Sequence, residues 1–385
     1  MTEADAIPIR AAVLEEFGGP IEIRDVLLDP PQAGEVLVRV AAAGVCHSDL
    51  HFAEGHLGRR RVPVVLGHEG AGVVEAVGEG VSHVAPGDHV TFCLVPPCGD
   101  CLPCRAGRGN LCERAGARAV EGTMLDGTFR FRLPDGRPLK HFNFISCFGD
   151  ACVVPARSAV PVPVDLPLVE AALIGCAVVT GVGAVRNATR IRIGDSVCVI
   201  GCGGVGLQVL AAVRMAGAGR IIAVDRGPDK LEAAVARGAT DTVDASAEDV
   251  VEAVRALSGG GVDHAIEVVG LPVTIRQAWD VLRPAGTAVV VGIAARGTEL
   301  SIPALDLLSE KILRGSFYGS ADPWVEIPVL AAMVASGRFP VADTVSHVTD
   351  LGDLQAAFER MRAGVGARTV MVIDPERAGT LRQSD

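Results

Sequence analysis

Short apolar runs separated by glycine and proline make up the first part of the chain, to about residue 180. Residues 35–45 (EVLVRVAAAGV) and 70–81 (GAGVVEAVGEGV) are typical of β-strands, because valines recur between turn-forming glycines. Many short strands of this kind predict a partly open β-barrel whose loops carry the polar side chains. We therefore expect residues 1–180 to form a β-rich domain.

The pattern changes near Gly181. Residues 196–201 (SVCVIG) form a continuous apolar run that is typical of a buried parallel strand, a helical pattern follows, and residues 220–225 (RIIAVD) predict the next strand. The alternation continues with a helix near 229–237, a strand at 262–270, a helix near 274–282 and a strand at 287–292. Alternating strands and helices predict an α/β domain, a doubly wound parallel sheet of the Rossmann type, over residues 181–320.

The last part of the chain, residues 321–385, predicts two helices and one strand. The helical patterns cover 323–337 and 351–364, and residues 367–373 (ARTVMVI) predict a strand. We expect this segment to return to the first domain, which makes that domain discontinuous. The end of the chain, 375–385, has the polar composition of a frayed tail.

Composition excludes several classes of function. The chain has 385 residues, enough for two domains, and a net charge of −11, which argues against a nucleic-acid binder. We find no apolar run of the roughly 18 to 20 residues that a membrane span needs, and the polar start lacks a secretory signal. A cytoplasmic location is therefore expected, and it suits eleven cysteines that we expect to be reduced.

Four cysteines lie close together in the segment 95–112, VPPCGDCLPCRAGRGNLC. The sulfurs of Cys98, Cys101, Cys104 and Cys112 can converge on one tetrahedral Zn²⁺. A closed shell of four cysteines leaves the metal no vacant position. This centre is therefore predicted to fix a loop rather than to perform chemistry.

A glycine-rich turn follows the first strand of the predicted Rossmann domain. Gly201, Gly203 and Gly206 permit a tight turn, a close approach of the backbone to a pyrophosphate, and close packing of helix on strand. Asp225 ends the next strand, where its carboxylate suits the adenosine ribose hydroxyls and repels a 2′-phosphate. We therefore predict NAD rather than NADP, although the neighbouring Arg226 could soften that preference.

A second candidate metal centre is dispersed along the chain. Cys46, His68 and Cys176 offer two thiolates and one imidazole, and the fourth tetrahedral position is left for water or a substrate oxygen. Each residue alone is more often an ordinary buried or loop residue. Their local sequences, taken together, favour a catalytic zinc.

These sequences closely resemble the medium-chain, zinc-dependent alcohol dehydrogenase family, which includes a thiol-dependent formaldehyde dehydrogenase branch. The resemblance covers nearly the whole chain: GVCHSDLH, GHEGAGVVEAVGEGV, PPCGDCLPC with NLC, GCAVVTGVGA, VIGCGGVG with VD, and GARTVMVI. It implies a GroES-like catalytic domain, a Rossmann domain, two zinc ions per subunit and reversible hydride transfer between an alcohol and NAD.

The resemblance also implies roles for single residues. Cys46, His68 and Cys176 would hold the catalytic zinc, with Glu69 nearby and Asp49 orienting the ring of His68. Ser48 and His51 would form a proton relay from the substrate hydroxyl to solvent. The implied cofactor contacts are His47, Thr180, Gly204, Val205, Lys230, Val269, Val291 and Arg368, in addition to the residues of the turn.

Two regions depart from the family pattern. The loop GHLGRRRVP (55–63) has an extra residue, and Arg59, Arg60 and Arg61 there could attract an acidic substrate or a thiol adduct. Residues 141–154 lack the usual TFSEY-like strand entry, so the pocket wall is not predicted. Because both regions border the expected substrate pocket, the substrate is the part of the function that the resemblance predicts least.

Three rival functions stay open beside oxidation of a primary or secondary alcohol, a class that includes bulky and aromatic alcohols. The first is oxidation of an S-hydroxymethyl thiol adduct, and the second is a nicotinoprotein whose NAD never leaves. The third is a zinc-stabilised NAD-binding module without activity. The runs at 287–292 and 311–319 lie where family members join their sheets, so a homodimer or homotetramer is expected.

Overall fold

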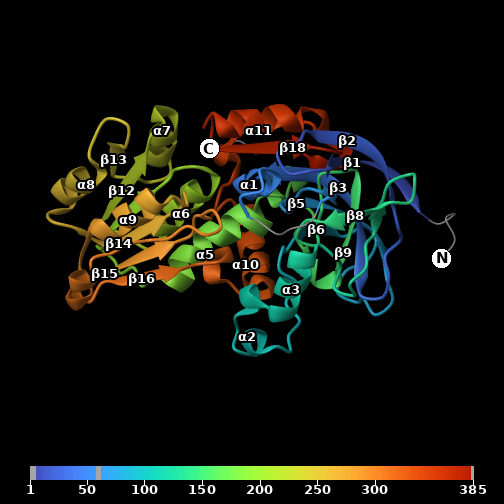
Figure 1. Cartoon of the computed structure of the whole chain (residues 1–385), viewed down its shortest axis with the longest axis horizontal. Coiled ribbons are helices and arrows are strands. Elements are labelled where there is room, and N and C mark those ends of the chain that lie inside the picture. Colours follow the sequence, from blue (N-terminus) through green and yellow to red (C-terminus); the bar gives the residue numbers. More distant parts are fainter. Residues whose placement is uncertain (1–5, 58–61, 383–385) are drawn as a thin grey trace. The chain divides into compact units, whose positions relative to one another are not determined.

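The structure, a computed structural model, describes residues 6–57 and 62–382 (Figure 1). It divides into two compact units. Unit 1 comprises Met1–Cys176, Asp322–Ala363 and Arg368–Asp385, and unit 2 comprises Ala177–Ala321 and Gly364–Ala367. The sequence analysis drew its divisions after residues 180 and 320 and assigned 364–367 to the returning segment. In both divisions the first domain is discontinuous.

Unit 1 contains a small closed barrel. Its strands, in barrel order, are β1 (Ile7–Leu14), β2 (Ile21–Leu28), β7 (Phe131–Arg132), β8 (Pro138–His141) and β4 (Val64–Val65). The sequence predicted a partly open barrel, but the ring closes because β1 pairs with β2 along one edge and with β4 along the other.

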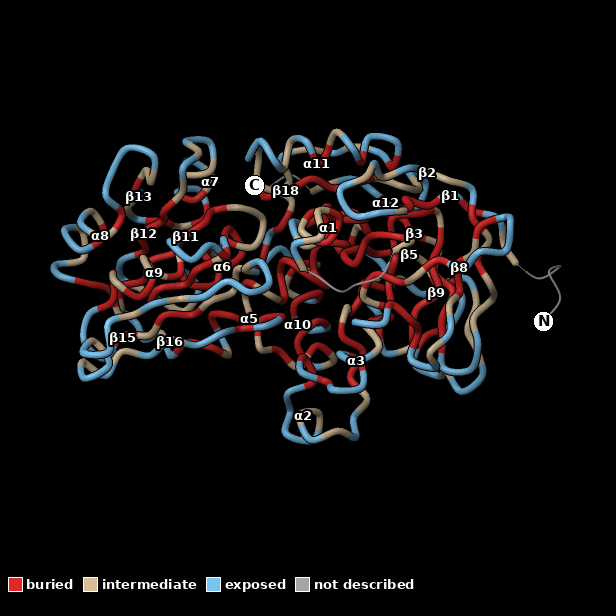
Figure 2. Tube along the Cα trace, in the orientation of Figure 1, coloured by how far each residue is buried: buried red, intermediate tan, exposed pale blue. Residues whose placement is uncertain are grey.

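A second sheet of unit 1 carries the segments that lead into the candidate centres. Its strands are β10 (Ala159–Pro161), β6 (His89–Phe92), β5 (Gly70–Val77), β3 (Glu35–Val45), β18 (Arg368–Val372) and β17 (Val345–Thr349), with β9 (Ala151–Pro155) also paired to β3. Strand β18 runs antiparallel to β3, with Thr369 opposite Val45. The predicted return of the C-terminal segment to the first domain is therefore confirmed, and β3 lies in the buried interior (Figure 2).

Seven α-helices accompany these strands among the described residues of unit 1. They are α1 (His47–Ala53), α2 (Leu102–Arg105), α3 (Glu113–Glu121), α4 (Leu168–Ala171), α10 (Pro323–Ala335), α11 (Leu354–Arg362) and α12 (Pro375–Ala378). The predicted helices near 323–337 and 351–364 are α10 and α11.

The end of the chain is not the frayed tail that we predicted. Asp374 caps α12 by accepting hydrogen bonds from the backbone N–H groups of Glu376 and Arg377. Further on, Arg382 forms an ion pair of 2.5 Å with the buried Glu170 and donates to the carbonyl oxygen of Val334. A buried carboxylate needs a charged partner, so this contact fixes the segment as far as Arg382.

Unit 2 is a six-stranded sheet in which every adjacent pair is parallel. The order is β13 (Asp241–Asp244), β12 (Arg220–Asp225), β11 (Ser196–Ile200), β14 (Val262–Glu267), β15 (Leu282–Val290) and β16 (Ile312–Gly315). Its α-helices are α5 (Val179–Ala188), α6 (Gly204–Met215), α7 (Pro228–Ala236), α8 (Val250–Ser258) and α9 (Pro272–Asp280).

Both faces of this sheet are buried, as the predicted doubly wound fold requires. Along β11, Val197 and Val199 belong to one apolar cluster, whereas Cys198 and Ile200 belong to another. Successive side chains of a strand point to opposite faces, so a continuous apolar run identifies a strand covered on both sides. The prediction of a Rossmann-type domain is confirmed.

Strand β13 and helix α8 were not predicted from the sequence. A signal for α8 was present: Asp249 caps its start by accepting a hydrogen bond from the N–H of Glu252, and Val250 and Val254 are buried four residues apart. Strand β13 is short and polar, DTVD, and only its pairing with β12 defines it.

One expectation about apolar runs is wrong. The helical stretch Leu168–Ala188 is long and apolar enough to cross a membrane by length and composition, with a mean hydropathy of 2.1. However, 89% of its apolar window is buried inside the structure. Burial of this extent is typical of a core helix.

Candidate metal centres and cofactor site

The first cysteine of the dispersed centre lies where β3 meets α1. Cys46 follows the last residue of β3 and caps α1, and its N–H donates to the Asp49 carboxylate at 3.3 Å. Gly44 of β3 was not singled out from the sequence, yet a Cβ there would lie 2.7 Å from the carboxylate of Glu69. The glycine therefore makes room for a buried glutamate beside the cysteine.

The histidine of this centre lies on the turn that enters β5. Gly67 has a φ of +96°, which L side chains rarely adopt, and its N–H donates to Asp49 Oδ1 at 3.2 Å. The same oxygen is 3.2 Å from His68 Nδ1. Asp49 thus orients the ring of His68, the usual arrangement for a ligating imidazole, and leaves its Nε2 facing Cys176.

The second cysteine is in an unusual turn. Cys176 lies in the π-helical segment Ile174–Val178, immediately before α5. The preceding Gly175 approaches a neighbouring strand closely, because a Cβ there would lie 1.9 Å from the carbonyl oxygen of Phe92. Single π-helical turns are frequent at functional sites, since they change which side chains point inward.

The fold brings these residues together. One ligand atom from each of Cys46, His68, Glu69 and Cys176 lies within 4.8 Å of the others, and all four residues are buried. Cys176 Sγ and His68 Nε2 are 3.4 Å apart. Tetrahedral Zn²⁺ with its usual bond lengths holds a sulfur and a nitrogen ligand about 3.5 Å apart. The distance between Cys176 and His68 therefore has the length that a zinc ion requires, and the donor set fits this metal.

Electrostatics in this centre favours a thiolate at Cys46. A hydrogen bond from the Cys176 thiol, together with the nearby His68, lowers the pKa of Cys46 well below its ordinary value. Burial raises the pKa of Glu69 to about 7, although the guanidinium of Arg368 opposes that shift. A thiolate beside a second thiol and an imidazole is a donor set that binds Zn²⁺ strongly.

Arg368 lies deeper than its predicted role implied. It starts β18, and its Nη2 is 3.1 Å from the carboxylate of Glu69, while its Nη1 donates to the carbonyl oxygen of Val45 at 3.1 Å. The family resemblance implied a cofactor contact and did not indicate this ion pair. Contact between residues 299 positions apart has no signal in local sequence.

The proposed relay residues both lie on α1. Ser48 Oγ is 3.2 Å from Cys46 Sγ and 3.0 Å from His68 Nε2, so the hydroxyl adjoins the candidate ligands. His51 lies three residues further on, on the same face of the helix, and is only partly buried. His47 is exposed, and its ring centre is 6.2 Å from that of His51.

The wall of the centre comes from the segment that the sequence left unpredicted. Phe142 packs edge-on against His68, with ring centres 5.4 Å apart, and also contacts Phe52 at 4.8 Å. Asn143, Phe144 and Ser146 all have positive φ, so the part of the segment between β8 and β9 is an irregular turn rather than a strand. Arg59, Arg60 and Arg61 lie outside the described residues.

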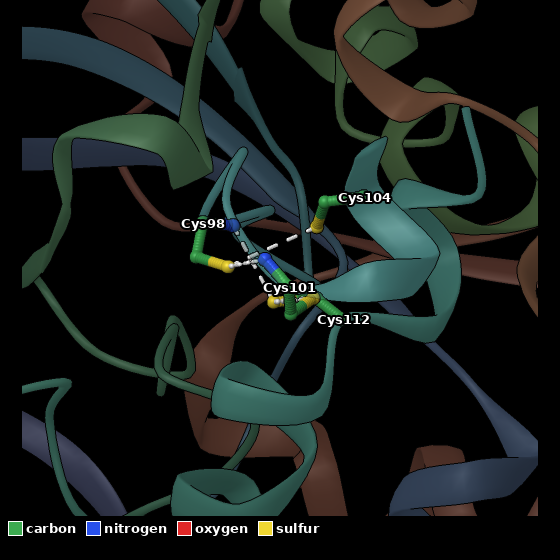
Figure 3. A group of neighbouring side chains, drawn as sticks. All are labelled: Cys98, Cys101, Cys104 and Cys112. Atoms are coloured by element: carbon green, nitrogen blue, oxygen red, sulfur yellow. Dashed lines mark hydrogen bonds between the residues drawn. The ribbon is translucent and has the colours of Figure 1, made fainter. Parts of the chain in front are cut away.

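The four-cysteine cluster forms as the spacing predicted (Figure 3). Cys101 precedes α2, Cys104 lies within it, and Cys112 precedes α3. The pairs Cys98–Cys104 and Cys101–Cys112 each have sulfurs 4.0 Å apart, close to the roughly 3.8 Å of a tetrahedral Zn²⁺ with four thiolates.

Backbone groups prepare these sulfurs for a metal. The N–H of Cys101 donates to Cys98 Sγ at 3.3 Å, and the N–H of Cys98 donates to Cys112 Sγ at 3.4 Å. Partial burial raises the pKa of Cys98, but backbone N–H donors outweigh it and lower the value to about 6. Such donors stabilise thiolate ligands, so this donor set also fits zinc.

The glycine turn of unit 2 has the geometry of a dinucleotide site. Gly201 has a φ of +98°, and a Cβ at Gly206 would lie 1.9 Å from the carbonyl oxygen of Gly201. Gly203 precedes α6, and a Cβ there would meet nothing within 4 Å, so the space beside it is open. An open space at a helix N-terminus fits a pyrophosphate.

Asp225 faces this turn from the end of β12. Its carboxylate accepts hydrogen bonds from the backbone N–H groups of Cys202 at 2.7 Å, Arg226 at 2.7 Å and Gly227 at 3.0 Å. The carboxylate is thereby held beside the turn, where the sequence predicted a ribose contact.

The other predicted cofactor residues divide between the units. Val269 follows β14 and lies beside the turn, because a Cβ on Gly201 would be 2.7 Å from Val269 Cγ2. The remaining ones in unit 2 are Thr180 on α5, Gly204 and Val205 on α6, Arg226 after β12, Lys230 on α7 and Val291 after β15. His47 and Arg368 belong to unit 1.

Comparisons with known proteins agree with both units. Residues 32–164 match the alcohol dehydrogenase GroES-like domain, and residues 204–336 match the zinc-binding dehydrogenase family. The S-(hydroxymethyl)glutathione dehydrogenase of Synechocystis sp. is 39% identical over 365 residues, which cover 94% of this chain and 99% of that protein.

Solved structures of similar proteins extend over almost the whole chain. An alcohol dehydrogenase zinc-binding domain protein from Burkholderia ambifaria has a TM-score of 0.91 at 37% identity, covering 96% of this chain and all of that one. The benzyl alcohol dehydrogenase of Acinetobacter calcoaceticus has a TM-score of 0.90 at 32% identity, covering 95% and 99%. The chain belongs to the medium-chain, zinc-dependent alcohol dehydrogenase family.

Proposed function

We propose that the preferred substrate is the S-hydroxymethyl adduct of a low-molecular-weight thiol, which the protein oxidises to the S-formyl thiol. As a family member, the chain is a zinc-dependent oxidoreductase that transfers a hydride between an alcohol and a nicotinamide dinucleotide. We choose this substrate because the Synechocystis relative, whose match covers 94% of this chain, is an S-(hydroxymethyl)glutathione dehydrogenase. The reaction removes two electrons and one proton as hydride, and a second proton from the hydroxyl.

The residues of the dispersed centre and of α1 have distinct tasks in this reaction. Cys46, His68 and Cys176 would hold the zinc, which supplies Lewis-acid chemistry by lowering the pKa of the substrate hydroxyl. Ser48 accepts the hydroxyl proton, and His51 passes it to solvent. Asp49 keeps Nδ1 of His68 engaged, so that Nε2 faces the centre.

Glu69 and Arg368 form a charge pair beside these ligands. Both are buried, and their side chains are 3.1 Å apart. The positive charge of the Arg368 guanidinium compensates part of the negative charge of the cysteines. The Glu69 carboxylate can approach a ligand position when the coordination of the metal would change. Cys98, Cys101, Cys104 and Cys112 would hold a second zinc that stabilises their loop.

A second candidate substrate is a free aromatic alcohol. The benzyl alcohol dehydrogenase of Acinetobacter calcoaceticus shares the fold with a TM-score of 0.90. Phe142 packs against His68 and Phe52 packs against Phe142, so the surroundings of the centre are aromatic.

The two substrates are separated by following NADH formation at 340 nm. Purified protein is offered NAD with formaldehyde, with formaldehyde plus glutathione or another thiol, and with benzyl alcohol. Oxidation of formaldehyde only when a thiol is present supports our proposal. Faster oxidation of benzyl alcohol than of every thiol adduct favours the second candidate. NADH released by heating an inactive protein would identify a nicotinoprotein.

We also propose NAD as the dinucleotide, on the position of Asp225. Its carboxylate lies where the 2′-phosphate of NADP would approach, and like charges repel. Replacing Asp225 with glycine should therefore lower the ratio of kcat/KM for NAD to that for NADP by about tenfold or more, a difference of about 1.4 kcal/mol. An unchanged ratio would contradict this assignment.

The assembly that we propose is a homodimer or a homotetramer in the cytoplasm. Strand β16 is the outermost strand of its sheet; Leu308 shortly before it is 80% exposed, and Ile312, its first residue, is 51% exposed. An unpaired apolar edge is suited to pairing with a second copy. The eleven free cysteines suit a reducing compartment. Light scattering after size-exclusion chromatography would measure the oligomer.

A further inference from the structure

A third group of metal-ligating side chains lies at the end of α1, separate from both cysteine centres. His51, Glu54 and His56 each offer one ligand atom, and these atoms lie within 4.8 Å of one another. His51 is in the last turn of α1, Glu54 follows the helix, and His56 comes two residues later. All three belong to unit 1.

The backbone holds these side chains together. Gly55 has a φ of +78° and reverses the chain directly after the helix. The N–H of His56 then donates to the carbonyl oxygen of His51 at 2.9 Å, which returns His56 over the helix end. The two imidazoles therefore face each other because of a helix-ending turn.

The distances match those of zinc ligands. His51 Nδ1 and His56 Nδ1 are 3.4 Å apart, and His56 Nδ1 is 3.5 Å from Glu54 Oε2. Two nitrogen ligands at their usual bond lengths on a tetrahedral Zn²⁺ lie about 3.3 to 3.4 Å apart, and a nitrogen and an oxygen lie about as far. Two of the three edges therefore already have the length that a bound ion requires.

The chemical state of the rings also suits a transition metal. Burial, together with the nearby His56, lowers the pKa of His51 and favours its neutral form. Two Nδ1 atoms at 3.4 Å cannot both carry a proton without repulsion, so at least one ring presents a lone pair to the other. Neutral imidazole nitrogens suit Zn²⁺, Cu²⁺ and Ni²⁺ but not Mg²⁺ or Ca²⁺.

An ion pair with Arg362 opposes metal binding at this group, whereas the exposure of its side chains lets an ion enter from solvent. Arg362 Nε is 2.8 Å from Glu54 Oε1, so a guanidinium competes for the carboxylate. The side chains of His56 and Glu54 are 50% and 26% exposed, so an ion from solvent can reach them. A partly exposed site with three ligands and a competing cation should be weak and exchangeable, unlike the two cysteine centres.

We propose that His51, Glu54 and His56 form an exchangeable site for Zn²⁺ or a similar transition-metal ion, and that an ion there inhibits the enzyme. The inhibition rests on the proposed function, in which His51 passes the substrate proton to solvent. An imidazole that binds a metal through Nδ1 keeps its proton on Nε2 and has no lone pair left. It can therefore no longer accept a proton.

Binding is measured first and does not depend on activity. Protein that contains its two resident zinc ions per chain is dialysed against buffered Zn²⁺, and bound metal is measured. We expect one further ion per chain, with a Kd in the micromolar range. His56→Ala and Glu54→Gln remove ligands and should each raise that Kd by about tenfold or more, because even partners of metal ligands contribute about 10- to 100-fold.

Three matched variants test the geometry. His347→Ala and Glu79→Gln change a histidine and a glutamate elsewhere in unit 1 and should leave the Kd unchanged. Arg362→Gln removes the competing guanidinium, so it should bind the third ion more tightly than the wild type. Equal Kd values for the wild type, His56→Ala and Glu54→Gln would overturn the site.

Inhibition is measured next, as NADH formation at increasing Zn²⁺. The midpoint of inhibition should equal the Kd from dialysis, and Mg²⁺ should have no effect. Relative to its own rate without added metal, His56→Ala should show no inhibition at Zn²⁺ concentrations that inhibit the wild type. If the third ion binds but turnover is unchanged, the inhibitory role is wrong. If no alcohol is oxidised at all, the proposed function fails, and the dialysis still decides the site.

Discussion

The two cysteine centres of unit 1 offer donor sets for the same metal and differ in how the chain builds them. The four ligands of the loop centre come from one 15-residue segment, 98–112, and no other protein group is needed to complete the shell. The dispersed centre draws Cys46, His68 and Cys176 from three places along a 131-residue span. Its ligands depend on β3, β5 and the π-helical turn for their positions.

This difference separates a stabilising centre from a reactive one. Four thiolates saturate a tetrahedral ion, so the loop centre can only hold its segment together. Two thiolates and an imidazole leave one position open, and Ser48 adjoins that group at 3.0 Å from His68 Nε2. Buried charges at the dispersed centre, Glu69 and Arg368, also have no counterpart among the loop cysteines.

Removing one ligand of the dispersed centre should have the largest effect on activity. Cys46→Ala should lower kcat/KM by about a thousandfold or more, since loss of the metal removes several kcal/mol of transition-state stabilisation. Cys152→Ala, which removes another buried cysteine that lies outside both clusters, should keep most of the activity. Circular dichroism verifies folding. An unchanged rate of alcohol oxidation by Cys46→Ala would contradict the assignment of Cys46 as a ligand of a catalytic zinc.

The opposite result is expected at the loop centre. Cys104→Ala should lose one zinc per chain and lower the midpoint of thermal unfolding by roughly 5 to 10 °C, because a structural zinc contributes to folding free energy. The protein that remains folded should keep its kcat. Metal analysis measures the zinc content, and calorimetry measures the midpoint of thermal unfolding. Cys93→Ala is the control, since Cys93 is buried and lies close in sequence but outside the cluster.

A smaller effect is expected from changing Asp49, the residue that orients His68. Asp49→Asn should weaken zinc binding at the dispersed centre by about 10- to 100-fold and leave the loop centre unchanged. The rate at which a chelator removes each zinc distinguishes the two. Asp135→Asn, on an exposed turn, is the control. Equal loss of both ions would mean that Asp49 supports the fold rather than the ligand.

The smallest expected effect compares two buried histidines. His68 faces the Asp49 carboxylate, whereas His141 accepts a hydrogen bond from the N–H of Arg130, and burial, aided by the Arg130 charge, lowers its pKa to about 3. In the unfolded chain His141 binds a proton below about pH 6.5. Stability from this group is therefore present above that pH and is lost as the pH falls towards 3.

Urea unfolding at several pH values measures this loss. Between pH 6.5 and pH 5, the wild type should lose about 2 kcal/mol more of its unfolding free energy than His141→Gln, which has no proton to bind. The difference between the two proteins removes the contribution of all other titrating groups. Parallel pH curves would show that His141 is not held neutral in the fold.

Much of the fold could be predicted because its signals are local. The continuous apolar run of β11, the glycines that follow it and the alternating helices identified the Rossmann-type unit. The short polar β13 was missed because it has no apolar pattern and exists through pairing with β12. The C-terminal tail was misjudged because Glu170, which fixes Arg382, is 212 residues away.

The candidate site shows the same division. Residue type and local context predicted the seven cysteine and histidine residues of the two centres and Asp225, and the family resemblance predicted the relay residues. They gave no indication that Gly44 makes room for Glu69, that Arg368 pairs with that carboxylate, or that Phe142 packs against His68. These contacts join distant segments, and a single sequence contains no measure of the distance between them.

The sequence by itself determined the family, the two-domain α/β class, the closed cysteine shell and the residue types available for hydride-transfer chemistry. Spacing and local pattern are sufficient for these, because each depends on residues close together in the chain. Only the tertiary structure decided which buried charges face each other, how Asp49 orients His68, and that His56 returns to His51. Ligand geometry depends on distances of a few ångströms between distant segments, and packing alone sets them.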